Sequence, residues 1–454
     1  MHYVFEIGVS LNPLDTKAEK FEDTHMYILY NIILFAAAII ILPYFLLKII
    51  FTGKYRKSFI QKLGGRQSKI LADLKDGPRV WIHAVSVGEV TAAAPIVASL
   101  KFKRPEVQII FSTSTETGQE IARKFIKEAA AFIYFPLDIP HIVRKMINLA
   151  RPNVFVLVET ELWPNFLRVC AICQIKTLMV NGRISPRSYS KYRLTRFFWK
   201  IILYNLNAAG MIARIDAERL KNIGMDSAKI KVLGNAKYDA LAALASPTLR
   251  EEIARRFNAR ENERFIVAGS THEGEEKIVI DVYQELLKLY PDFKLIIVPR
   301  HIERTNDVLS LLKQANFNDV VTLSDINNGR KRKDERIIVV DVIGELFKVY
   351  SLAAVVYCGG SLVPKGGQNI LEAAAWGKVI FYGPSMEDFS AEKALLEEAG
   401  CGATIRNEKE LLQGIIQVLE NPEELKSRGE KGKAVVLANI GAAARYADLI
   451  SKHI

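Results

Sequence analysis

The chain has 454 residues, of which 50% are hydrophobic and 25% charged, and its formal net charge is +12. This composition is that of an ordinary globular protein, and the length predicts two or more domains. Four cysteines in so long a chain argue against a disulfide framework. The basic excess is compatible with a nucleic acid, an anionic membrane or a phosphorylated substrate as partner, and it selects none of them by itself.

The first predicted element is a membrane helix. Residues 26–51 are apolar except for Asn31 and Lys48, a run long enough to cross a bilayer. Acidic residues precede the run and basic residues follow it, so the positive-inside rule places everything after residue 53 in the cytoplasm. The run starts too late for a signal peptide. We expect residues 1–25 to be an N-terminal extension and 26–51 a single anchor; an interfacial helix and a buried core helix are the alternatives.

The remaining sequence alternates short apolar runs with helix-like segments. Runs that are apolar on both faces and rich in β-branched residues are typical of parallel strands buried between helices. Two series of such runs predict two doubly wound α/β domains. The runs are 79–86, 107–114, 153–160, 177–183, 210–214 and 229–237, then 264–270, 293–301, 320–325, 336–342, 353–361 and 377–383. We expect an N-terminal domain over 53–238, a polar linker over 239–262 and a C-terminal domain over 263–454.

Polar residues follow most of these runs, and in parallel sheets ligands gather at the carboxyl ends of the strands. Any one of these residues could be a cap or a turn residue. Because they recur in both halves, we expect a ligand site in each domain. In the first half, "HAVSVGEV" (83–90) places Glu89 at a strand-to-helix junction. The helix dipole is expected to favour an ionised carboxylate there, which suits a general base; a capping role is the alternative.

Further charged residues follow later strands of the first half. "VETELWPN" contributes Glu159 and Glu161, and Lys237 in "GNAKYD" could place positive charge near an anionic donor. A metal-binding Glu-x-Glu pair is conceivable, but no Asp-x-Asp or His lies nearby, so no metal is expected. The basic and aromatic stretch 181–200 could be a helix surface, a nucleic-acid patch or an anionic-lipid contact, and the predicted anchor favours the lipid.

The second half carries a Gly-rich turn that leads into a helix, "GGSLVPKGGQNILEAAAWG" (359–377). Backbone N–H groups and the helix dipole at such a turn bind phosphate or carboxylate. Glu372 follows Asn369 by three residues and could accept hydrogen bonds from a ribose diol. The turn matches neither Walker A nor the G-x-G-x-x-G fingerprint. Arg300, after another strand, can meet a phosphate in bidentate fashion, and "IGEL" (343–346) again opens a helix. These features predict a nucleotide site.

We interpret two other patterns as structural features rather than functional sites. The C-x-x-C of Cys170 and Cys173 has no second pair nearby, so we expect ordinary reduced packing cysteines. The charge run 328–336, "NGRKRKDER", is expected to be a solvated loop, with a phosphate-binding patch as the alternative.

Taken together, the motifs resemble the 3-deoxy-D-manno-octulosonic acid (Kdo) transferase family of lipopolysaccharide assembly. The resemblance runs from about residue 26 to the end through "YRKSFIQKLGG", "HAVSVGEVTAAAPIV", "VETELWPN", "NGRISPRS", "GSTHEGEE", "VPRHIER" and the Gly-rich turn. It implies a GT-B glycosyltransferase with two Rossmann-like α/β domains facing a cleft. It further implies transfer of Kdo from CMP-Kdo to a lipid A precursor (lipid IVA) with release of CMP, at the cytoplasmic face of the inner membrane.

The resemblance also implies residue roles. Glu89 matches the general base, and Glu159 and Lys237 match transition-state stabilisers. The residues matching CMP-binding segments are Pro299, Arg300, Gly344, Glu345, Leu346, Asn369, Ile370, Leu371 and Glu372. No cofactor, metal or nucleic acid is implied; the implied partners are CMP-Kdo, the lipid acceptor and an anionic membrane surface. Gln368 stands where many members have His, which puts a cationic role there in doubt.

Three other functions fit parts of the pattern. Another membrane-associated GT-B glycosyltransferase would keep the fold and the anchor but use a different donor. A GT-B-like sugar-nucleotide epimerase would share the nucleotide site without needing an anchor. A non-catalytic, anchored nucleotide-binding protein would have no use for Glu89.

Overall fold

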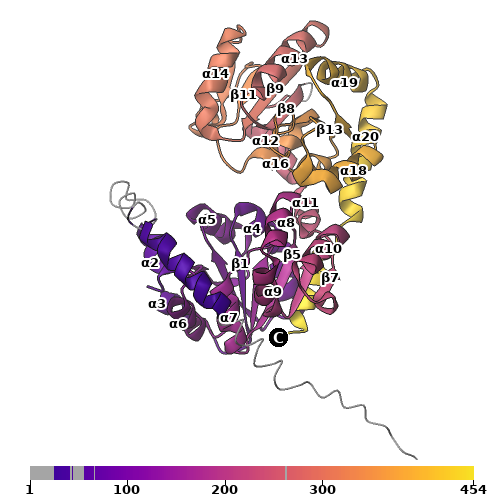
Figure 1. Ribbon diagram of the computed structural model, residues 1–454. Helices are drawn as coiled ribbons and strands as arrows, with labels where there is room; N and C mark the ends of the chain where they lie inside the picture. The colour runs from indigo at the N-terminus through magenta and orange to yellow at the C-terminus, as the bar shows by residue number, and fades with distance from the viewer. Residues whose placement is uncertain (1–24, 41–42, 44–55, 66, 261–262) are drawn as a thin grey trace, which may run out of the picture. The chain divides into compact units, whose positions relative to one another are not determined.

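The structure, a computed structural model, describes residues 25–40, 43, 56–65, 67–260 and 263–454. The described chain forms two compact units. Unit 1 takes in the chain up to Ala236 together with Ala442–Ile454, and unit 2 comprises Lys237–Gly441. Figure 1 shows the C-terminal helix, in yellow, among the indigo and magenta elements of unit 1. The predicted extension 1–25 lies almost wholly outside the described residues.

Unit 1 is built on a seven-stranded sheet with the order β3-β2-β1-β4-β5-β6-β7, in which every pair is parallel. Successive side chains of a strand point to opposite faces of the sheet. In β4, Phe155 and Leu157 join one core, whereas Val156 and Val158 join the other. Both faces are thus buried, which explains the uninterrupted apolar runs. The strands are β1 (Arg79–Ala84), β2 (Gln108–Thr113), β3 (Ala129–Tyr134), β4 (Val154–Val158), β5 (Lys176–Gly182), β6 (Ala208–Met211) and β7 (Ile230–Val232).

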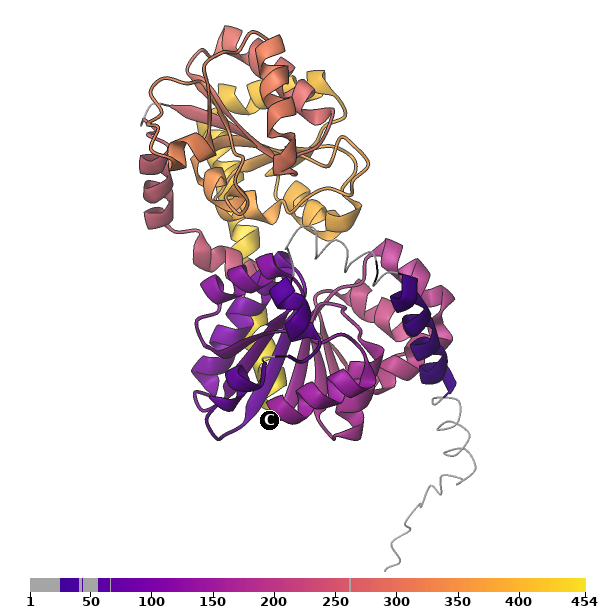
Figure 2. The same cartoon turned by 90° about the vertical axis from the view of Figure 1, so that its left-hand side faces the viewer.

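Helices cover both faces of this sheet (Figure 2). The core that contains Phe155 is closed by α6, α7, α9 and α10, and the core that contains Val156 by α4, α5 and α21. The helices of unit 1 include His25–Ile40, α2 (Arg56–Lys62), α3 (Gln67–Ala72), α4 (Val87–Lys103), α5 (Glu116–Phe125), α6 (Pro140–Ala150), α7 (Pro164–Ile172), α8 (Pro186–Leu194), α9 (Arg196–Tyr204), α10 (Arg214–Ile223) and α21 (Ala442–Ser451), with a 3₁₀ turn at Ser227–Lys229.

Unit 2 repeats the plan with the order β10-β11-β9-β8-β12-β13-β14, again parallel throughout. In β12, Val355 and Tyr357 join one core and Val356 and Cys358 the other. The strands are β8 (Arg264–Thr271), β9 (Phe293–Pro299), β10 (Val320–Thr322), β11 (Ile337–Val339), β12 (Ala353–Cys358), β13 (Val379–Tyr382) and β14 (Gly402–Thr404).

The helices of unit 2 also lie on both faces of its sheet. The core that contains Val355 is closed by α13, α14 and α19, and the core that contains Val356 by α12, α17 and α20. They are α11 (Ala236–Leu244, which begins at the unit boundary), α12 (Pro247–Arg256), α13 (Glu275–Leu289), α14 (Thr305–Gln314), α15 (Leu323–Asn327), α16 (Leu346–Val349), α17 (Leu371–Ala375), α18 (Ser390–Glu398), α19 (Glu408–Glu420) and α20 (Pro422–Ala438), with 3₁₀ turns at Ile302–Arg304, Tyr350–Leu352 and Glu387–Phe389.

The predicted α/β class with two doubly wound sheets is confirmed, but some predicted boundaries differ from those observed. The segment predicted as a linker, 239–262, contains most of α11 together with α12. Leu241, Ile253 and Phe257 from this segment are buried in the core of unit 2. The exposed charged residues of α12 explain why the composition of this segment predicts a linker. Residues 442–454, predicted in the C-terminal domain, return instead to unit 1.

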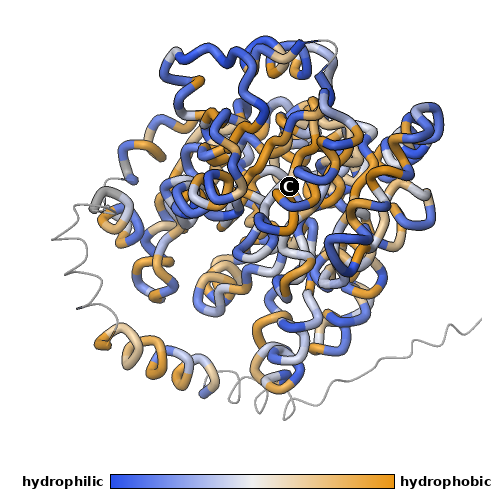
Figure 3. Tube along the Cα trace, turned by 90° about the horizontal axis from the view of Figure 1, so that it is seen from above, coloured by the Kyte–Doolittle hydropathy of each residue, from blue (hydrophilic) through white to orange (hydrophobic). Residues whose placement is uncertain are grey.

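The predicted membrane helix 26–51 is only partly within the described residues. The apolar helix His25–Ile40 is described, whereas of residues 41–51 only Pro43 is described. Most of it is hydrophobic in Figure 3. Among the described residues, the stretch with the length and composition of a membrane span is Pro422–Ser451. Its second part, α21, is buried in the core of unit 1 through residues such as Tyr446 and Ile450, as a core helix would be.

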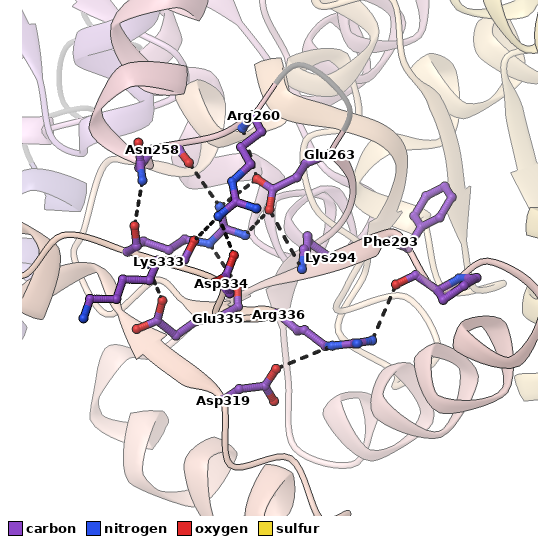
Figure 4. Close-up of polar contacts among 12 residues, drawn as sticks. Asn258, Arg260, Glu263, Phe293, Lys294, Asp319, Lys333, Asp334, Glu335 and Arg336 are labelled. Atoms are coloured by element: carbon purple, nitrogen blue, oxygen red, sulfur yellow. Dashed lines mark hydrogen bonds and ion pairs between the residues drawn. The ribbon is translucent and has the colours of Figure 1, made fainter.

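The charge run 328–336 is not entirely solvated, because Arg332 is buried. Figure 4 shows polar contacts in this region, with Glu263, Lys294 and Glu335 labelled. Its guanidinium donates to both carboxylate oxygens of Glu263 at 2.8 Å, and its Nε donates to the carbonyl of Glu335 at 2.9 Å. Asn258 Nδ2 donates to the carbonyl of Arg332 at 2.8 Å. Most neighbours in the run are exposed, as expected. The run is therefore a loop that a buried ion pair fixes to the start of β8.

Replacing Arg332 with Met should lower the free energy of unfolding of unit 2 by about 3 kcal/mol. Removing one member of a buried pair leaves an uncompensated charge and costs about 3–5 kcal/mol, and Lys294, 3.9 Å from Glu263, should limit the loss to the lower end. Denaturant unfolding measures this loss. The matched control is Arg260→Met, whose ion pair with Asp334 is exposed and should contribute less than about 1 kcal/mol. Equal effects of the two substitutions would contradict a structural role for Arg332.

Candidate functional site

The strand order sets where a ligand can bind in each unit. In unit 1 the order reverses between the paired strands β1 and β4. The chain leaves β1 into α4 on one face of the sheet and leaves β4 into α7 on the other. In unit 2 the same divergence occurs between β8 and β12, which lead to α13 and α17. Ligands of doubly wound sheets bind at such switch points, beyond the carboxyl ends of the strands.

Glu89 lies at the switch point of unit 1, in the first turn of α4. Ser86 caps this helix, since its Oγ accepts from the backbone N–H of Glu89 at 3.3 Å. In return, the Glu89 carboxylate accepts from the Val85 N–H at 2.7 Å and from the Ser86 hydroxyl at 2.9 Å. This is a variant of the capping box, because the carboxylate accepts from the N–H of Val85, one residue before the N-cap. The capping role is therefore real, and it holds the Glu89 carboxylate in a fixed position at the end of β1.

The ionisation of Glu89 differs from the sequence-based expectation. The helix dipole alone favours the charged form, but burial raises the pKa of Glu89 to about 7. The negative charges of Glu159 and Glu161 raise it further, while hydrogen bonds from Val85 and Ser86 act in the opposite direction. Desolvation of a carboxylate that is only 6% exposed outweighs the dipole. A carboxyl group with a pKa near 7 is suited to general acid–base chemistry.

Glu159 and Glu161 lie across the switch point, immediately after β4. Glu159 has a φ of +60° and Asn181, at the end of β5, a φ of +52°, and non-glycine residues adopt this region infrequently. Such strained positions cluster at functional sites. Burial and the charge of Glu159 raise the pKa of Glu161. Asn181 Oδ1 accepts from the Ala236 N–H at 2.9 Å, one residue before Lys237.

In unit 2, predicted residues from three separate segments come together around Glu372. Burial raises the pKa of Glu372 to about 7, and a hydrogen bond from Asn369 and the positive charges of Lys237 and Arg300 moderate the rise. The Asn369 Nδ2 donates to Glu372 Oε1 at 3.2 Å. Lys237 was predicted within the N-terminal domain, but it opens unit 2 and acts electrostatically on Glu372. The structure thus unites four of the predicted residues.

The other predicted residues contribute in different ways. Ile370 and Leu371 are buried in the core, so only their backbone can contact a ligand. The Glu345 carboxylate is paired with Arg256 at 2.8 Å and with Lys348 at 3.0 Å, which fixes α16 to α12. Gly344 has a φ of +86°. Pro299 ends β9.

Arg300 and Gly344 are positioned by neighbouring elements. The Arg300 N–H donates to the carbonyl of Thr271 at 2.9 Å, which joins the loop after β9 to the end of β8. Beyond Gly344, α16 is linked to the end of α17, because Trp376 Nε1 donates to the carbonyl of Phe347 at 2.8 Å. The segment after β9 is thus joined to the end of β8, and the segment after β11 is joined to the one after β12.

Sequence reasoning missed several residues that shape the site. It gave no role to Ser86, Asn181 or Glu275, and none to the buried pair of Glu276 with Arg304 (2.7 Å). All of them lie in the polar stretches that follow strands, and this location was the one feature of the sequence that could have identified them. Among the described residues, no three His, Cys, Asp or Glu side chains gather as metal ligands would. That the reaction needs no metal stays a prediction.

Comparison with known proteins identifies relatives over most of the chain. The family described as 3-deoxy-D-manno-octulosonic-acid transferase (kdotransferase) matches residues 56–240. A 3-deoxy-D-manno-octulosonic acid transferase from Haemophilus influenzae is 30% identical over 83% of this chain and 87% of its own length. A bifunctional glycosyltransferase/methyltransferase from Fusobacterium nucleatum is 33% identical over 85% of this chain, which spans 60% of the length of that relative.

Solved structures support the fold. The UDP-GlcNAc 2-epimerase from Neisseria meningitidis, bound to UDP-GlcNAc, superimposes with a TM-score of 0.59. The superposition covers 83% of this chain and 99% of the epimerase chain, at 14% sequence identity. At this identity the likeness shows the fold alone, two Rossmann-like α/β domains.

The Glu89 carboxyl group should titrate near pH 7, being neutral below and able to accept a proton above. Replacing Glu159 with Gln removes a negative charge that disfavours ionisation, so the pKa of Glu89 should fall toward its ordinary value of 4.5. Carbon-detected NMR of ¹³C-labelled glutamate measures both values. Glu120→Gln, an exposed change on α5, is the control and should have no effect. An ordinary pKa for Glu89 in the unmodified protein would contradict this account.

Proposed function

Because this chain belongs to the 3-deoxy-D-manno-octulosonic acid (Kdo) transferase family, we propose that it transfers Kdo from CMP-Kdo to a lipid A precursor such as lipid IVA. The single observation that carries the proposal furthest is the buried Glu89 carboxylate at a switch point, with a pKa of about 7. The epimerase alternative is supported by a likeness of fold at 14% identity, whereas the 30% identity to a Kdo transferase extends over most of both chains.

Glu89 is proposed to be the general base. Its carboxylate, held by the Val85 N–H and the Ser86 hydroxyl, would accept the proton of the acceptor sugar hydroxyl. Because burial weakens its hydration, the ionised form at neutral pH is a stronger base than an exposed glutamate. Glu159 and Glu161 support the role, since their charges raise the pKa of Glu89 further. A negative Glu159 would also favour the positive charge that develops on the donor sugar.

Unit 2 is proposed to hold the donor. Arg300 can pair with the single phosphate of CMP, and Lys237, whose charge also acts on Glu372, adds a second positive charge. The Asn369–Glu372 segment offers an amide and a carboxyl group, which suit the hydroxyls of ribose. Buried Ile370 and Leu371 anchor that segment in the core. We assign Gly344, Glu345 and Leu346 a backbone contact with CMP, because the Glu345 carboxylate is already paired.

The proposed reaction is a single displacement. A bond forms between the acceptor oxygen and the anomeric carbon of Kdo while the bond from that carbon to the CMP phosphate breaks. The acceptor proton passes to Glu89, and CMP leaves with the bonding electron pair. Attack from the side opposite the leaving group inverts the anomeric configuration. The charges of Arg300 and Lys237 would stabilise the leaving phosphate, which is why we propose that no metal is needed.

A face of unit 1 is suited to a membrane surface. Helix His25–Ile40 is fixed to the unit by one side: Tyr27 is buried, the Tyr30 hydroxyl donates to Asp138 at 2.9 Å, and the Asn31 side chain donates to Asn165 at 3.1 Å. Its other side leaves large apolar residues exposed, among them Phe35 and Ile40.

The neighbouring helices extend this face. The Phe198 ring on α9 lies 5.9 Å from that of Tyr30, and Leu194 and Phe197 beside it are exposed. The same stretch carries basic residues at Arg187, Lys191, Arg193, Arg196 and Lys200. We propose that these apolar and basic groups rest in the interface of the anionic inner membrane, which would bring unit 1 to its lipid acceptor.

Glu89→Gln should abolish transfer while leaving CMP binding intact. Loss of a general base lowers kcat about 10²- to 10⁴-fold, and the substitution lies in unit 1, whereas the proposed donor residues belong to unit 2. Steady-state kinetics with CMP-Kdo and calorimetric titration with CMP measure the two effects. Glu120→Gln on the exposed side of α5 is the matched control. A Glu89→Gln enzyme with unchanged kcat would remove Glu89 from the mechanism.

Membrane binding should depend on the exposed apolar residues of this face. Burying a Phe side chain contributes about 1.5–3 kcal/mol, so Phe35→Ser and Phe197→Ser should each lower partitioning onto anionic vesicles about tenfold. Phe102→Ser is the control, because Phe102 is also highly exposed but lies at the end of α4. Co-sedimentation with phosphatidylglycerol vesicles gives the comparison. Equal losses from all three variants, or none, would refute the proposed face.

A further inference from the structure

Glu275, the first residue of α13, is a buried carboxylate with an unusually complete set of donors. Its Oε1 accepts from the Tyr357 hydroxyl at 2.8 Å and from the N–H groups of Ser361 and Leu362 at 3.0 Å each. Its Oε2 accepts from the N–H groups of Gly360 at 2.7 Å and His272 at 2.9 Å. Three consecutive backbone N–H groups of the turn after β12 therefore converge on one side chain.

This contact lies at the switch point of unit 2. The helix that carries Glu275 follows β8, and the turn that it binds follows β12, the paired strand whose chain leaves for the other face of the sheet. Gly360 adopts a φ of +67°, where a side chain would be strained. Five donors converge on this one buried side chain, and a buried donor that loses its partner costs free energy, so other conformations of the turn are disfavoured. Glu275 therefore fixes the conformation of the turn.

Hydrogen bonds connect this turn with the proposed donor segment, Asn369–Glu372. The Gly360 carbonyl accepts from the Gly367 N–H at 2.9 Å, and Gly367 stands two residues before Asn369. The hydroxyl of Ser361 accepts from the Gly383 N–H at 2.8 Å, and its carbonyl accepts from the Ser385 N–H at 3.0 Å. Ser385 in turn accepts from the Gly366 N–H at 3.0 Å through its hydroxyl. A continuous set of hydrogen bonds thus connects Glu275 with the start of the Asn369–Glu372 segment.

We propose that Glu275 is a positioning residue for the donor site: by holding the Gly360–Leu362 turn it sets the Gly-rich loop and the Asn369–Glu372 segment in the conformation that binds the nucleotide monophosphate of the donor. The proposal rests on the proposed function, because it takes the donor to be a CMP-sugar. Glu275 itself touches no substrate in this account. Its effect reaches the ligand only through the turn.

The test compares Glu275→Gln with two controls by calorimetric titration of CMP. A neutral Gln keeps one acceptor oxygen but presents an amide N–H to backbone donors, so CMP should bind at least tenfold more weakly, and the KM for CMP-Kdo should rise while that for the lipid acceptor stays constant. Glu263→Gln changes a buried carboxylate just before β8, at the opposite end of that strand, and should leave the Kd for CMP within twofold. Tyr357→Phe removes one donor but no backbone contact, and should also leave it unchanged.

The outcomes separate this proposal from the assigned function. Wild-type protein that fails to bind CMP would overturn both. Wild-type protein that binds CMP, together with a Glu275→Gln variant of equal affinity, would overturn the positioning role alone. A loss of affinity in Glu263→Gln as large as in Glu275→Gln would also overturn it, because that loss would reflect general destabilisation.

A second measurement does not depend on the folding of any variant. In the unliganded wild-type protein, the amide protons of Gly360, Ser361 and Leu362 should exchange with solvent as slowly as those of β12, because Glu275 accepts all three. Hydrogen–deuterium exchange reads this directly. Exchange at the rate of an exposed loop such as 328–331 would contradict the proposal.

Discussion

The reversal of strand order in each parallel sheet is the constraint on which the rest of the structure depends. At β1/β4 and at β8/β12, two paired strands send the following chain to opposite faces. The backbone groups at these strand ends cannot all be satisfied by the sheet, so they need side-chain partners or a ligand. In unit 1 the switch point presents three acidic side chains. In unit 2 one of its carboxylates, Glu275, is used instead to bind the two diverging segments together.

Burial then sets the chemistry of the two units. The pKa values of Glu89 and Glu372 are both raised to about 7, and in each case desolvation is the largest cause. The charges of the neighbouring side chains have opposite signs in the two units. Glu159 and Glu161 raise the pKa of Glu89 further, whereas Lys237 and Arg300 favour the charged form of Glu372. An acidic surrounding suits a base that must take a proton from a hydroxyl. A basic surrounding suits a site for a phosphate.

Much of this could be predicted from sequence, because doubly buried parallel strands have an unmistakable apolar pattern and because polar residues recur at their ends. The strands that were missed, β3 and β14, are rich in alanine and glycine or only three residues long, and such segments have little strand propensity. The return of α21 to unit 1 depends on its packing against distant helices, which no local pattern encodes. The burial of Arg332 inside a charge run, the ionisation of Glu89 and the five donors to Glu275 likewise depend on neighbours far away in the sequence.

We propose that this chain transfers Kdo to a lipid A precursor. The most direct test incubates the purified full-length protein in detergent with CMP-Kdo and a tetraacylated lipid A precursor and follows the mass of the lipid. The account predicts an increase in mass by whole Kdo units, with one CMP released for each unit added. An unchanged lipid mass, in a folded protein that still binds CMP, would contradict this donor–acceptor pair and leave only the nucleotide site.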